Sequence, residues 1–355
     1  MNSKQHILLL KKIKKMKNKI IITGGAGYIG SHTAVEFINE GFEVIIVDNL
    51  SNSDLSVLDS IKSITGVKPK FENVDLTDKD KTSIFFETHK DAAGLINFAA
   101  FKAVGESVQL PLQYYHNNLN ILLNTIDCMD RFGIRNLIFS SSATVYGLPD
   151  SFPLNENSTT KRPTSPYGNT KKIGEEIIED FSKAVKNFKA ISLRYFNPIG
   201  AHSSGDLGET PTGIPNNLMP FITQTGLGLR DELKIFGNDY ETKDGTAVRD
   251  YIHVVDLAKA HVLALQRLIR NEGYENFEIF NIGTGIGYSV LDVVASFEKT
   301  TKQKLNYSFA TRREGDVPIL YASTLKAKEE LNWNPTLTLD DMTKSSWEWE
   351  KKRNI

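Results

Sequence analysis

The sequence has a single cysteine, Cys128, among its 355 residues. One thiol cannot form an internal disulfide or a thiolate metal cluster, so the sequence fits a reducing compartment, with the cytoplasm as the default. Net charge is also nearly absent, because 42 Lys and Arg residues oppose 43 Asp and Glu residues and leave −1. Such a chain has no general attraction for a phosphate backbone or an anionic bilayer, and we expect neither a nucleic acid nor a membrane as a partner.

Long hydrophobic runs are missing as well. The apolar run at residues 7–10 is followed by lysines and is too short for a signal peptide, which needs roughly 7–15 apolar residues. Residues 1–19 hold seven lysines and no acidic residue. We predict that residues 1–16 are a basic extension. A solvated tail is the favoured interpretation, and an arm for a membrane or RNA is the alternative.

What the sequence has is a glycine-rich turn between two buried strands. Ile20 to Thr23 is a short β-branched run that predicts a strand buried on both faces. Glycines 24, 25, 27 and 30 follow, then a helix that Gly41 ends, and then a strand at 44–47. Asp48 closes that strand, eighteen residues after Gly30. This order is that of a βαβ unit for binding a dinucleotide.

The chemistry of such a cofactor explains these residue types. Glycine lets backbone N–H groups approach a pyrophosphate, whose charge the helix N-terminus stabilises. A carboxylate at Asp48 can accept hydrogen bonds from a ribose and would repel a 2′-phosphate, so the sequence favours NAD.

Further buried strands are predicted at 70–75, 94–100 and 136–140, with helices between them, for example at 117–132. This alternation predicts an α/β fold with a doubly wound parallel, Rossmann-type sheet. Ligands bind such sheets at the carboxyl ends of the strands. We therefore expect one crevice bordered by Asp75, Phe98, Ala99, Lys102 and Ser140 to Ser142.

Tyr167 and Lys171 follow that crevice on a helix opened by Pro166. Residues at i and i+4 share a helix face. An ammonium and a nicotinamide cation would both favour the phenolate form of the tyrosine, which could then accept a proton. Ser142 would hold the same substrate hydroxyl. The histidines show no metal-ligand spacing, and we predict no metal site.

These segments carry a resemblance. Residues 23–32 (TGGAGYIGSH), residues 140–147 (SSSATVYG) and the Tyr167/Lys171 pair resemble the UDP-glucose 4-epimerase family, within the extended short-chain dehydrogenase/reductase superfamily. The similarity spans residues 17–349 and includes the motifs KAVGES (102–107), LRYFNP (193–198), IPNNLMP (214–220), VRDYIH (248–253) and RREGD (312–316).

The resemblance implies an isomerase that interconverts UDP-galactose and UDP-glucose. A hydride passes from C4 of the sugar to tightly bound NAD, the 4-ketopyranose rotates, and the hydride returns to the opposite face. The implied catalytic residues are Ser142, Tyr167 and Lys171. The implied cofactor-binding residues are Gly24, Gly27, Tyr28, Ile29, Gly30, Asp48, Asn49, Asn52, Ser53, Asp75, Leu76, Phe98, Ala99, Ala100, Lys102, Asn117, Ser142, Tyr167, Lys171 and Phe196. The implied substrate-binding residues are Lys102, Ser142, Tyr167, Asn197, Asn217, Leu218, Phe236, Arg249, Arg313, Asp316 and Leu320.

The resemblance also implies an NAD-binding domain at 17–197 and a smaller mixed α/β lobe at 198–355 for the UDP-sugar, with parts of 245–285 returning to the first domain. It implies a homodimer through helices near 112–132 and 173–185. Leu320 aligns with a position that lines the sugar pocket, and its bulk should exclude an N-acetyl group.

Three alternatives stay open. A nucleotide-sugar 4,6-dehydratase shares the fold, but that family carries Asp-Glu where this chain has Ala143-Thr144. A decarboxylase would also be expected to carry an acid at position 144. A non-catalytic NAD-binding module is the third, since fold alone does not fix function.

Overall fold

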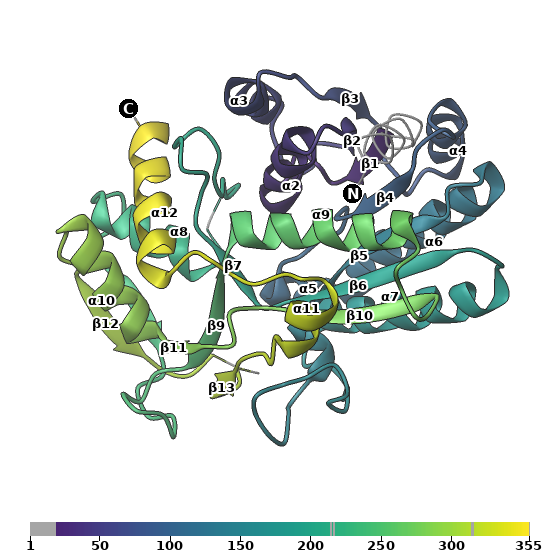
Figure 1. Cartoon of the computed structure of the whole chain (residues 1–355). Coiled ribbons are helices and arrows are strands. Elements are labelled where there is room, and N and C mark those ends of the chain that lie inside the picture. The colour runs from purple at the N-terminus through teal and green to yellow at the C-terminus, as the bar shows by residue number, and fades with distance from the viewer. Residues whose placement is uncertain (1–18, 214, 216, 314–315, 355) are drawn as a thin grey trace, which may run out of the picture.

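A seven-stranded parallel sheet forms the centre of the molecule (Figure 1). The computed structural model describes residues 19–213, 215, 217–313 and 316–354, so the predicted extension at 1–16 lies outside the described residues. The strand order is β3-β2-β1-β4-β5-β6-β10. The strands are β1 (Lys19–Thr23), β2 (Glu43–Asp48), β3 (Lys70–Asn73), β4 (Gly94–Asn97), β5 (Asn136–Ser142), β6 (Lys189–Tyr195) and β10 (Phe277–Ile282).

Alternate residues of each central strand enter different cores. In β1, Ile20 and Ile22 belong to one hydrophobic cluster, whereas Ile21 belongs to the cluster on the other face of the sheet. This alternation follows from the two-residue period of a strand. Because both faces are covered, β1 is an almost uninterrupted apolar run.

Two helical layers cover this sheet. The first cluster includes residues of α2 (Tyr28–Asn39), α3 (Ser56–Thr65) and α9 (Val254–Arg270). The second includes residues of α4 (Lys79–Thr88), α6 (Pro111–Phe132) and α7 (Pro166–Ala184). The short elements α5 (Val104–Gln109) and η1 (Ala143–Tyr146) follow β4 and β5. The predicted doubly wound α/β fold is confirmed.

Three predicted strand ends differ from the structure. The strands expected at 70–75 and 94–100 end at Asn73 and Asn97, and the strand expected to end at residue 140 continues to Ser142. After β3 the carboxylate of Asp75 accepts a bond from the Thr77 N–H, which turns the chain away from the sheet. β5 is longer because β6 pairs with it as far as Ser142.

A smaller lobe contains a four-stranded mixed sheet. Strand β9 (Val248–His253) pairs in parallel with β7 (Asn197–Ile199) and β13 (Ile319–Leu320), and antiparallel with β11 (Gly287–Ser289). A two-stranded parallel sheet of β8 (Leu233–Phe236) and β12 (Tyr307–Ala310) adds to it. The remaining helices are α8 (Leu218–Gly226), α10 (Val290–Thr301), α11 (Leu325–Glu330) and α12 (Leu339–Arg353).

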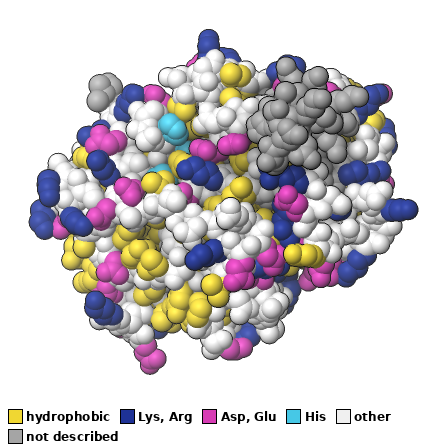
Figure 2. Space-filling view, in the orientation of Figure 1, with side chains coloured by type: hydrophobic (Ala, Val, Ile, Leu, Met, Phe, Trp, Pro, Cys, Tyr) yellow, Lys and Arg dark blue, Asp and Glu magenta, His cyan; other side chains and the backbone are white. Residues whose placement is uncertain are grey.

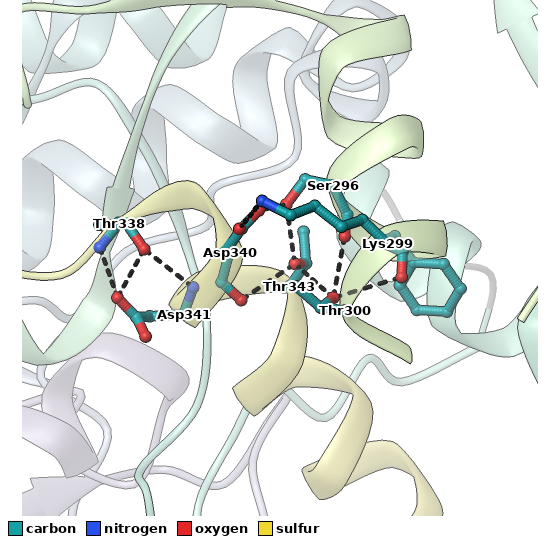
Figure 3. A network of polar contacts seen from close by, with 8 residues as sticks. Ser296, Lys299, Thr300, Thr338, Asp340, Asp341 and Thr343 are labelled. Atoms are coloured by element: carbon teal, nitrogen blue, oxygen red, sulfur yellow. Dashed lines mark hydrogen bonds and ion pairs between the residues drawn. The ribbon is translucent and has the colours of Figure 1, made fainter. Parts of the chain in front are cut away.

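A polar network fastens α12 to α10 (Figure 3). The carboxylate of Asp340 accepts bonds from Lys299 and Ser296, and the Thr343 hydroxyl lies 3.1 Å from those of Ser296 and Thr300. Further along α12, the Ser346 hydroxyl accepts a bond at 3.1 Å from the backbone N–H of Gly200, in the segment after β7. The network therefore fixes the helix against which the loop after β7 rests.

The chain returns to the first sheet after the lobe has begun. Helix α9 packs on α2, and β10 pairs with β6 at the edge of the seven-stranded sheet. The division of the chain at residue 197 stays a prediction. Basic and acidic side chains alternate over the face in Figure 2, without a large field of one sign. None of the described helices is long and apolar enough to cross a membrane.

Candidate active site

The glycine-rich turn lies between β1 and α2, where backbone segments approach closely. Gly24 has a φ of +66°, and a Cβ there would lie 2.7 Å from the backbone nitrogen of Ala99. A Cβ on Gly30 would lie 2.5 Å from the carbonyl oxygen of Gly24. Gly27 caps α2 without a side-chain hydrogen bond, and no acidic residue lies in the first turn. Gly24, Ala26 and Gly27 donate their N–H groups within the protein, so the N–H groups in the first turn of α2 are the ones available to an anion such as a pyrophosphate.

Asp48 holds the turn in place. Its Oδ2 accepts a bond from the Ala26 N–H at 3.1 Å. Its Oδ1 accepts from the Leu50 N–H at 2.9 Å and from the Ser53 hydroxyl at 3.0 Å. The carboxylate was predicted to accept bonds from a ribose. In this structure it joins the ends of β1 and β2, and Ser53, also predicted at the cofactor, is one of its donors.

The segment after β4 borders the same edge of the sheet. Thr23 donates to Asn97 at 2.7 Å, and its hydroxyl accepts from the Ala99 N–H. Asn118 bonds both the N–H and the carbonyl of Phe101 and donates to Thr170 on α7. The sequence pointed to Asn117, but Asn118 is the buried residue that joins this segment to α7. The apolar period of this helix could have identified Asn118, because the residue lies on the buried face of α6.

The other predicted cofactor residues lie around this edge. Asp75 accepts two bonds from Thr77 and one from Asn49 at 3.4 Å. Burial opposes the shift, but these hydrogen bonds outweigh it and lower the pKa of Asp75, so it is a carboxylate at neutral pH. Leu76 is in the core. Tyr28 donates its hydroxyl to the Gly200 carbonyl at 2.5 Å and so joins α2 to the smaller lobe. Asn52 is exposed and makes no hydrogen bond recorded among the described residues.

Tyr167, Lys171 and Ser142 meet at the carboxyl end of β5. Ser165 caps α7 by accepting from the Gly168 N–H, and Pro166 occupies the first turn as predicted. Lys171 donates to the Ser140 carbonyl at 2.6 Å, and its Nζ lies 5.9 Å from the centre of the Tyr167 ring. The Ser142 hydroxyl accepts from the Thr144 N–H at 3.2 Å. The three predicted catalytic residues therefore lie together at the carboxyl end of β5.

Burial dominates the protonation of this group. Burial raises the pKa of Tyr167 to about 12, and a hydrogen bond with Ser142 acts in the opposite direction. Burial lowers the pKa of Lys171 to about 8, while the charge of Glu175 raises it. The sequence led us to expect a phenolate favoured by Lys171. Without a cofactor cation, Tyr167 is a protonated phenol at neutral pH.

The predicted substrate residues form contacts within the smaller lobe. Arg249 donates to Asp316 at 2.7 Å, and the Arg313 guanidinium lies 5.1 Å from the centre of the Phe236 ring. Phe236 is 41% exposed, so its ring is open to a ligand. Each of the two arginines that were predicted to bind the diphosphate therefore lies beside a residue that was predicted to bind the nucleoside.

A carboxylate that the sequence did not single out connects the two lobes. Glu209 accepts from the Asn217 amide at 2.6 Å and lies 3.5 Å from the Lys102 ammonium. Trp349 of α12 donates to the Glu209 carbonyl at 3.0 Å. Asn217 also precedes Leu218, the first residue of α8, and makes no side-chain cap there.

Leu320 packs against a cluster that contains residues of η1, the element that directly follows Ser142. It packs on a buried cluster that includes Ala143 and Phe196, and it is opposite Arg249 in the pairing of β13 with β9. Asn197 begins β7, opposite Tyr251 of β9. Positions 143 and 144 are Ala and Thr, so this chain has no acid where the predicted alternative, a dehydratase, would carry Asp-Glu. Among the described residues, no three His, Cys, Asp or Glu side chains are grouped so that they could hold a metal ion.

Comparison with known proteins identifies the family. The model of the GDP-mannose 4,6 dehydratase family matches residues 21–346. UDP-glucose 4-epimerase of Bacillus subtilis is 48% identical over 332 residues, which cover 93% of this chain and 96% of the relative. The chain belongs to the UDP-glucose 4-epimerase family. The family predicted from the sequence motifs is thereby confirmed.

Solved structures of UDP-glucose 4-epimerases superpose on the chain. The enzyme from Stenotrophomonas maltophila, with bound NAD and formylated UDP-arabinopyranose, has a TM-score of 0.91 and 43% identity, covering 95% of this chain and 98% of that one. The enzyme from Bifidobacterium longum, in complex with NAD+ and UDP, has a TM-score of 0.90 and 43% identity, covering 95% and 99%. The uncapped glycine turn of this epimerase-family chain fits the same cofactor.

Proposed function

We propose that this chain interconverts UDP-galactose and UDP-glucose, with Tyr167 as the acid and base, Lys171 as its cationic neighbour and Ser142 as a hydrogen-bond partner of the reacting hydroxyl. The observation that carries the proposal is the meeting of these three side chains at the carboxyl end of β5, on the same sheet edge as the glycine turn. NAD is the cofactor of the reaction, and the chain is an isomerase because the sugar is neither oxidised nor reduced overall.

Tyr167 must exchange a proton with the sugar hydroxyl at C4. With a pKa of about 12 in this structure, the phenol is a poor base at neutral pH. The chemistry that bound NAD supplies is uptake of a hydride from C4 and its return, together with a positive charge near the phenol. That charge and the Lys171 ammonium both lower the pKa of a neighbouring phenol, because they stabilise the phenolate.

The cofactor would be held mainly by backbone groups. The N–H groups of Tyr28, Ile29 and Gly30 in the first turn of α2 would face the pyrophosphate, and Gly24 and Gly27 would let it approach the backbone closely. The ribose and the base would lie toward Asp48 and Asp75. The remaining residues proposed at the cofactor are Asn49, Asn52, Ser53, Leu76, Phe98, Ala99, Ala100, Lys102, Asn117 and Phe196.

The nucleotide of the substrate would be gripped by the smaller lobe. Arg249 and Arg313 offer guanidinium groups, which suit a diphosphate because they donate two parallel hydrogen bonds. Asp316 would bind a ribose hydroxyl, and the exposed Phe236 ring would lie along the uracil. Lys102, Asn197, Asn217, Leu218 and Leu320 complete the proposed contacts.

The hexose must be held more loosely than the nucleotide. The ketone intermediate receives its hydride on the opposite face only if the sugar turns between the two transfers. Firm binding of the UDP group keeps the intermediate in the site while it turns, since binding energy remote from C4 can be used for retention.

The same proposal includes a homodimer in the cytoplasm. Large apolar side chains are exposed on helix α6 at Leu112 (71%) and Leu123 (48%). Exposed apolar groups of this size favour burial against a partner. The single cysteine, Cys128, is buried, as suits a reducing compartment.

The test is to incubate the purified full-length chain with UDP-galactose and, separately, with UDP-glucose, and to separate the products by chromatography. We expect each substrate to give a mixture of both. Denaturing the protein should release NAD in an amount roughly equimolar with the chain, as measured by mass analysis. A chain that contains NAD and converts neither sugar would contradict the proposal.

A further inference from the structure

A buried ion pair lies directly behind the candidate catalytic group. Glu175 of α7 and Arg194 of β6 have side chains that are 8% and 4% exposed. Arg194 donates through Nε at 3.0 Å and through Nη2 at 2.7 Å, so the two side chains meet in a two-pronged contact. Its guanidinium also lies 4.8 Å from the centre of the Tyr146 ring. Neither residue was singled out in the sequence.

Glu175 is placed by the helix on the same side as the catalytic residues. Tyr167, Lys171 and Glu175 are spaced by four residues, so they lie along one face of α7. All three are therefore turned toward the ends of β5 and β6.

Three successive serines of β5 contact this face. The Ser140 carbonyl accepts from Lys171 at 2.6 Å, and the Ser141 hydroxyl donates to Glu175 at 2.5 Å. Ser142, the next residue, is the hydrogen-bond partner of Tyr167. Ser141 is also paired with Arg194 across the sheet. The ion pair thus fixes the strand residue that lies between the two contacts of the catalytic group.

The charge of Glu175 acts on Lys171. Burial lowers the pKa of the ammonium, and Glu175 is the charged group that raises it. Other titratable groups packed around α7 have other partners. Tyr195 of β6 and Tyr114 of α6 interact with Tyr167. Glu106 of α5 accepts a bond from Tyr114 at 2.5 Å. From η1, Tyr146 acts on Arg194.

We propose that the Glu175–Arg194 pair is a positioning device for the reaction, in which it holds the end of β5 against α7 and its carboxylate keeps Lys171 in the ammonium form. The inference rests on the proposed function, because it assumes that the ammonium assists Tyr167. Neither residue of the pair is proposed to touch the substrate.

The test is the pH dependence of kcat in Glu175→Gln, measured on the NAD-containing protein with UDP-galactose. Glutamine retains the size of the side chain and an oxygen that accepts hydrogen bonds, but removes the charge. Lys171 should then lose its proton at lower pH, so the alkaline limb of the profile should move down by about one pH unit. KM should change less than twofold, because the nucleotide contacts lie in the other lobe.

The chain contains a matched control. Arg267 and Glu278 form a second buried two-pronged pair, with side chains 7% and 4% exposed and distances of 2.8 and 2.9 Å. Arg267 belongs to α9, which covers the face of the sheet opposite α7. Arg267 also donates to the Glu330 carboxylate at 3.2 Å, so Glu278→Gln removes the same charge but leaves the arginine a second partner, and it should leave the pH profile unchanged.

A double variant separates the charge of Glu175 from an unpaired Arg194. Glu175→Gln with Arg194→Met leaves no buried cation without a partner, and we expect the same downward shift of the alkaline limb. An unmoved limb in both variants, or an equal movement in Glu278→Gln, would overturn the proposal. Failure of both Glu175 variants to fold while Glu278→Gln folds would make the pair a folding element and overturn it too. An inactive parent would instead contradict the proposed function.

Discussion

At the scale of single residues, Tyr167 offers the most direct test of the mechanism. Tyr167→Phe removes only a hydroxyl from a partly buried ring, so the fold and the glycine turn should persist. Loss of proton transfer by a positioned group lowers rates by about 10²–10⁴-fold, and we expect turnover of UDP-galactose to fall by that amount. Bound NAD, measured in the denatured protein, should stay at the parental level.

Tyr115→Phe is the matched control for Tyr167. Tyr115 lies on α6. Its hydroxyl accepts a bond at 2.8 Å from the side-chain amide of Asn169, which is two residues after Tyr167. It loses the same hydroxyl without losing a proposed catalytic group, so its turnover should stay within a few-fold of the parent. Near-parental turnover in Tyr167→Phe would exclude this residue as the acid and base.

Leu320 is the residue that should decide which hexoses are accepted. It packs against the cluster that includes Ala143 and Phe196, and we propose that an acetamido group on the sugar would need room there. Burying that amide without partners costs about 1–3 kcal/mol, in addition to the clash with the leucine. We therefore expect little epimerisation of UDP-N-acetylglucosamine by the parent and a gain of about tenfold or more in Leu320→Ser.

Ile319→Ser controls for loss of an apolar residue on the same strand, because neighbouring residues of a strand face opposite sides. It should leave the preference among sugars unchanged, and UDP-galactose turnover serves as the reference for each variant. Efficient turnover of the N-acetylated sugar by the parent, or no gain in Leu320→Ser, would remove Leu320 as the determinant.

At the scale of an element, the glycine turn predicts a large effect from one methyl group. In Gly30→Ala the new Cβ would lie 2.5 Å from the Gly24 oxygen and 2.8 Å from the Gly25 Cα, so α2 must move away from the turn. The N–H groups of the turn then lose their alignment with an anion. We expect the purified variant to contain less than a tenth of the parental NAD.

Gly105→Ala is a suitable control for this change. Gly105 is also a helical glycine, but nothing lies within 4 Å of the position of its Cβ. Alanine favours a helix over glycine, so this variant should fold and retain NAD. Parental NAD content in Gly30→Ala would show that the turn does not bind the cofactor as proposed.

The elements near the glycine turn were predictable because their signals are local. The β-branched run of β1, the glycines and the apolar period of α2 each report on a few neighbouring residues. β1 and β2 lie where the sequence placed them, whereas α2 begins at Tyr28, before the last of the glycines. The ion pair of Glu175 with Arg194 was not predictable in this way. It joins residues nineteen positions apart through a sheet, and a single glutamate on a helix reads as a solvated charge.

At the scale of the whole molecule, order in the chain and order in space diverge. Strand β10 lies beside β6 although the residues of β7, α8, β8, β9 and α9 come between them in the sequence. Neither β6 nor β10 was predicted as a strand from the sequence, and a local sequence pattern does not show which sheet edge a distant strand joins. A motif resemblance, and not periodicity, indicated that part of 245–285 would return.

The proposed dimer is also a property of the whole molecule. Leu112 and Leu123 are eleven residues apart, about three helical turns, so they share one face of α6 and could be buried together by a second copy. A stable interface buries roughly 1,200–2,000 Å² in total, and a charge at its centre remains desolvated without a partner.

In sedimentation experiments the parent should behave as a dimer of two 39.7 kDa chains, and Leu112→Glu with Leu123→Glu should sediment as a monomer. Leu325→Glu, at a leucine that is 65% exposed on α11, should leave the dimer intact. A dimer in the double variant, or a parental monomer at micromolar concentration, would contradict an interface through α6.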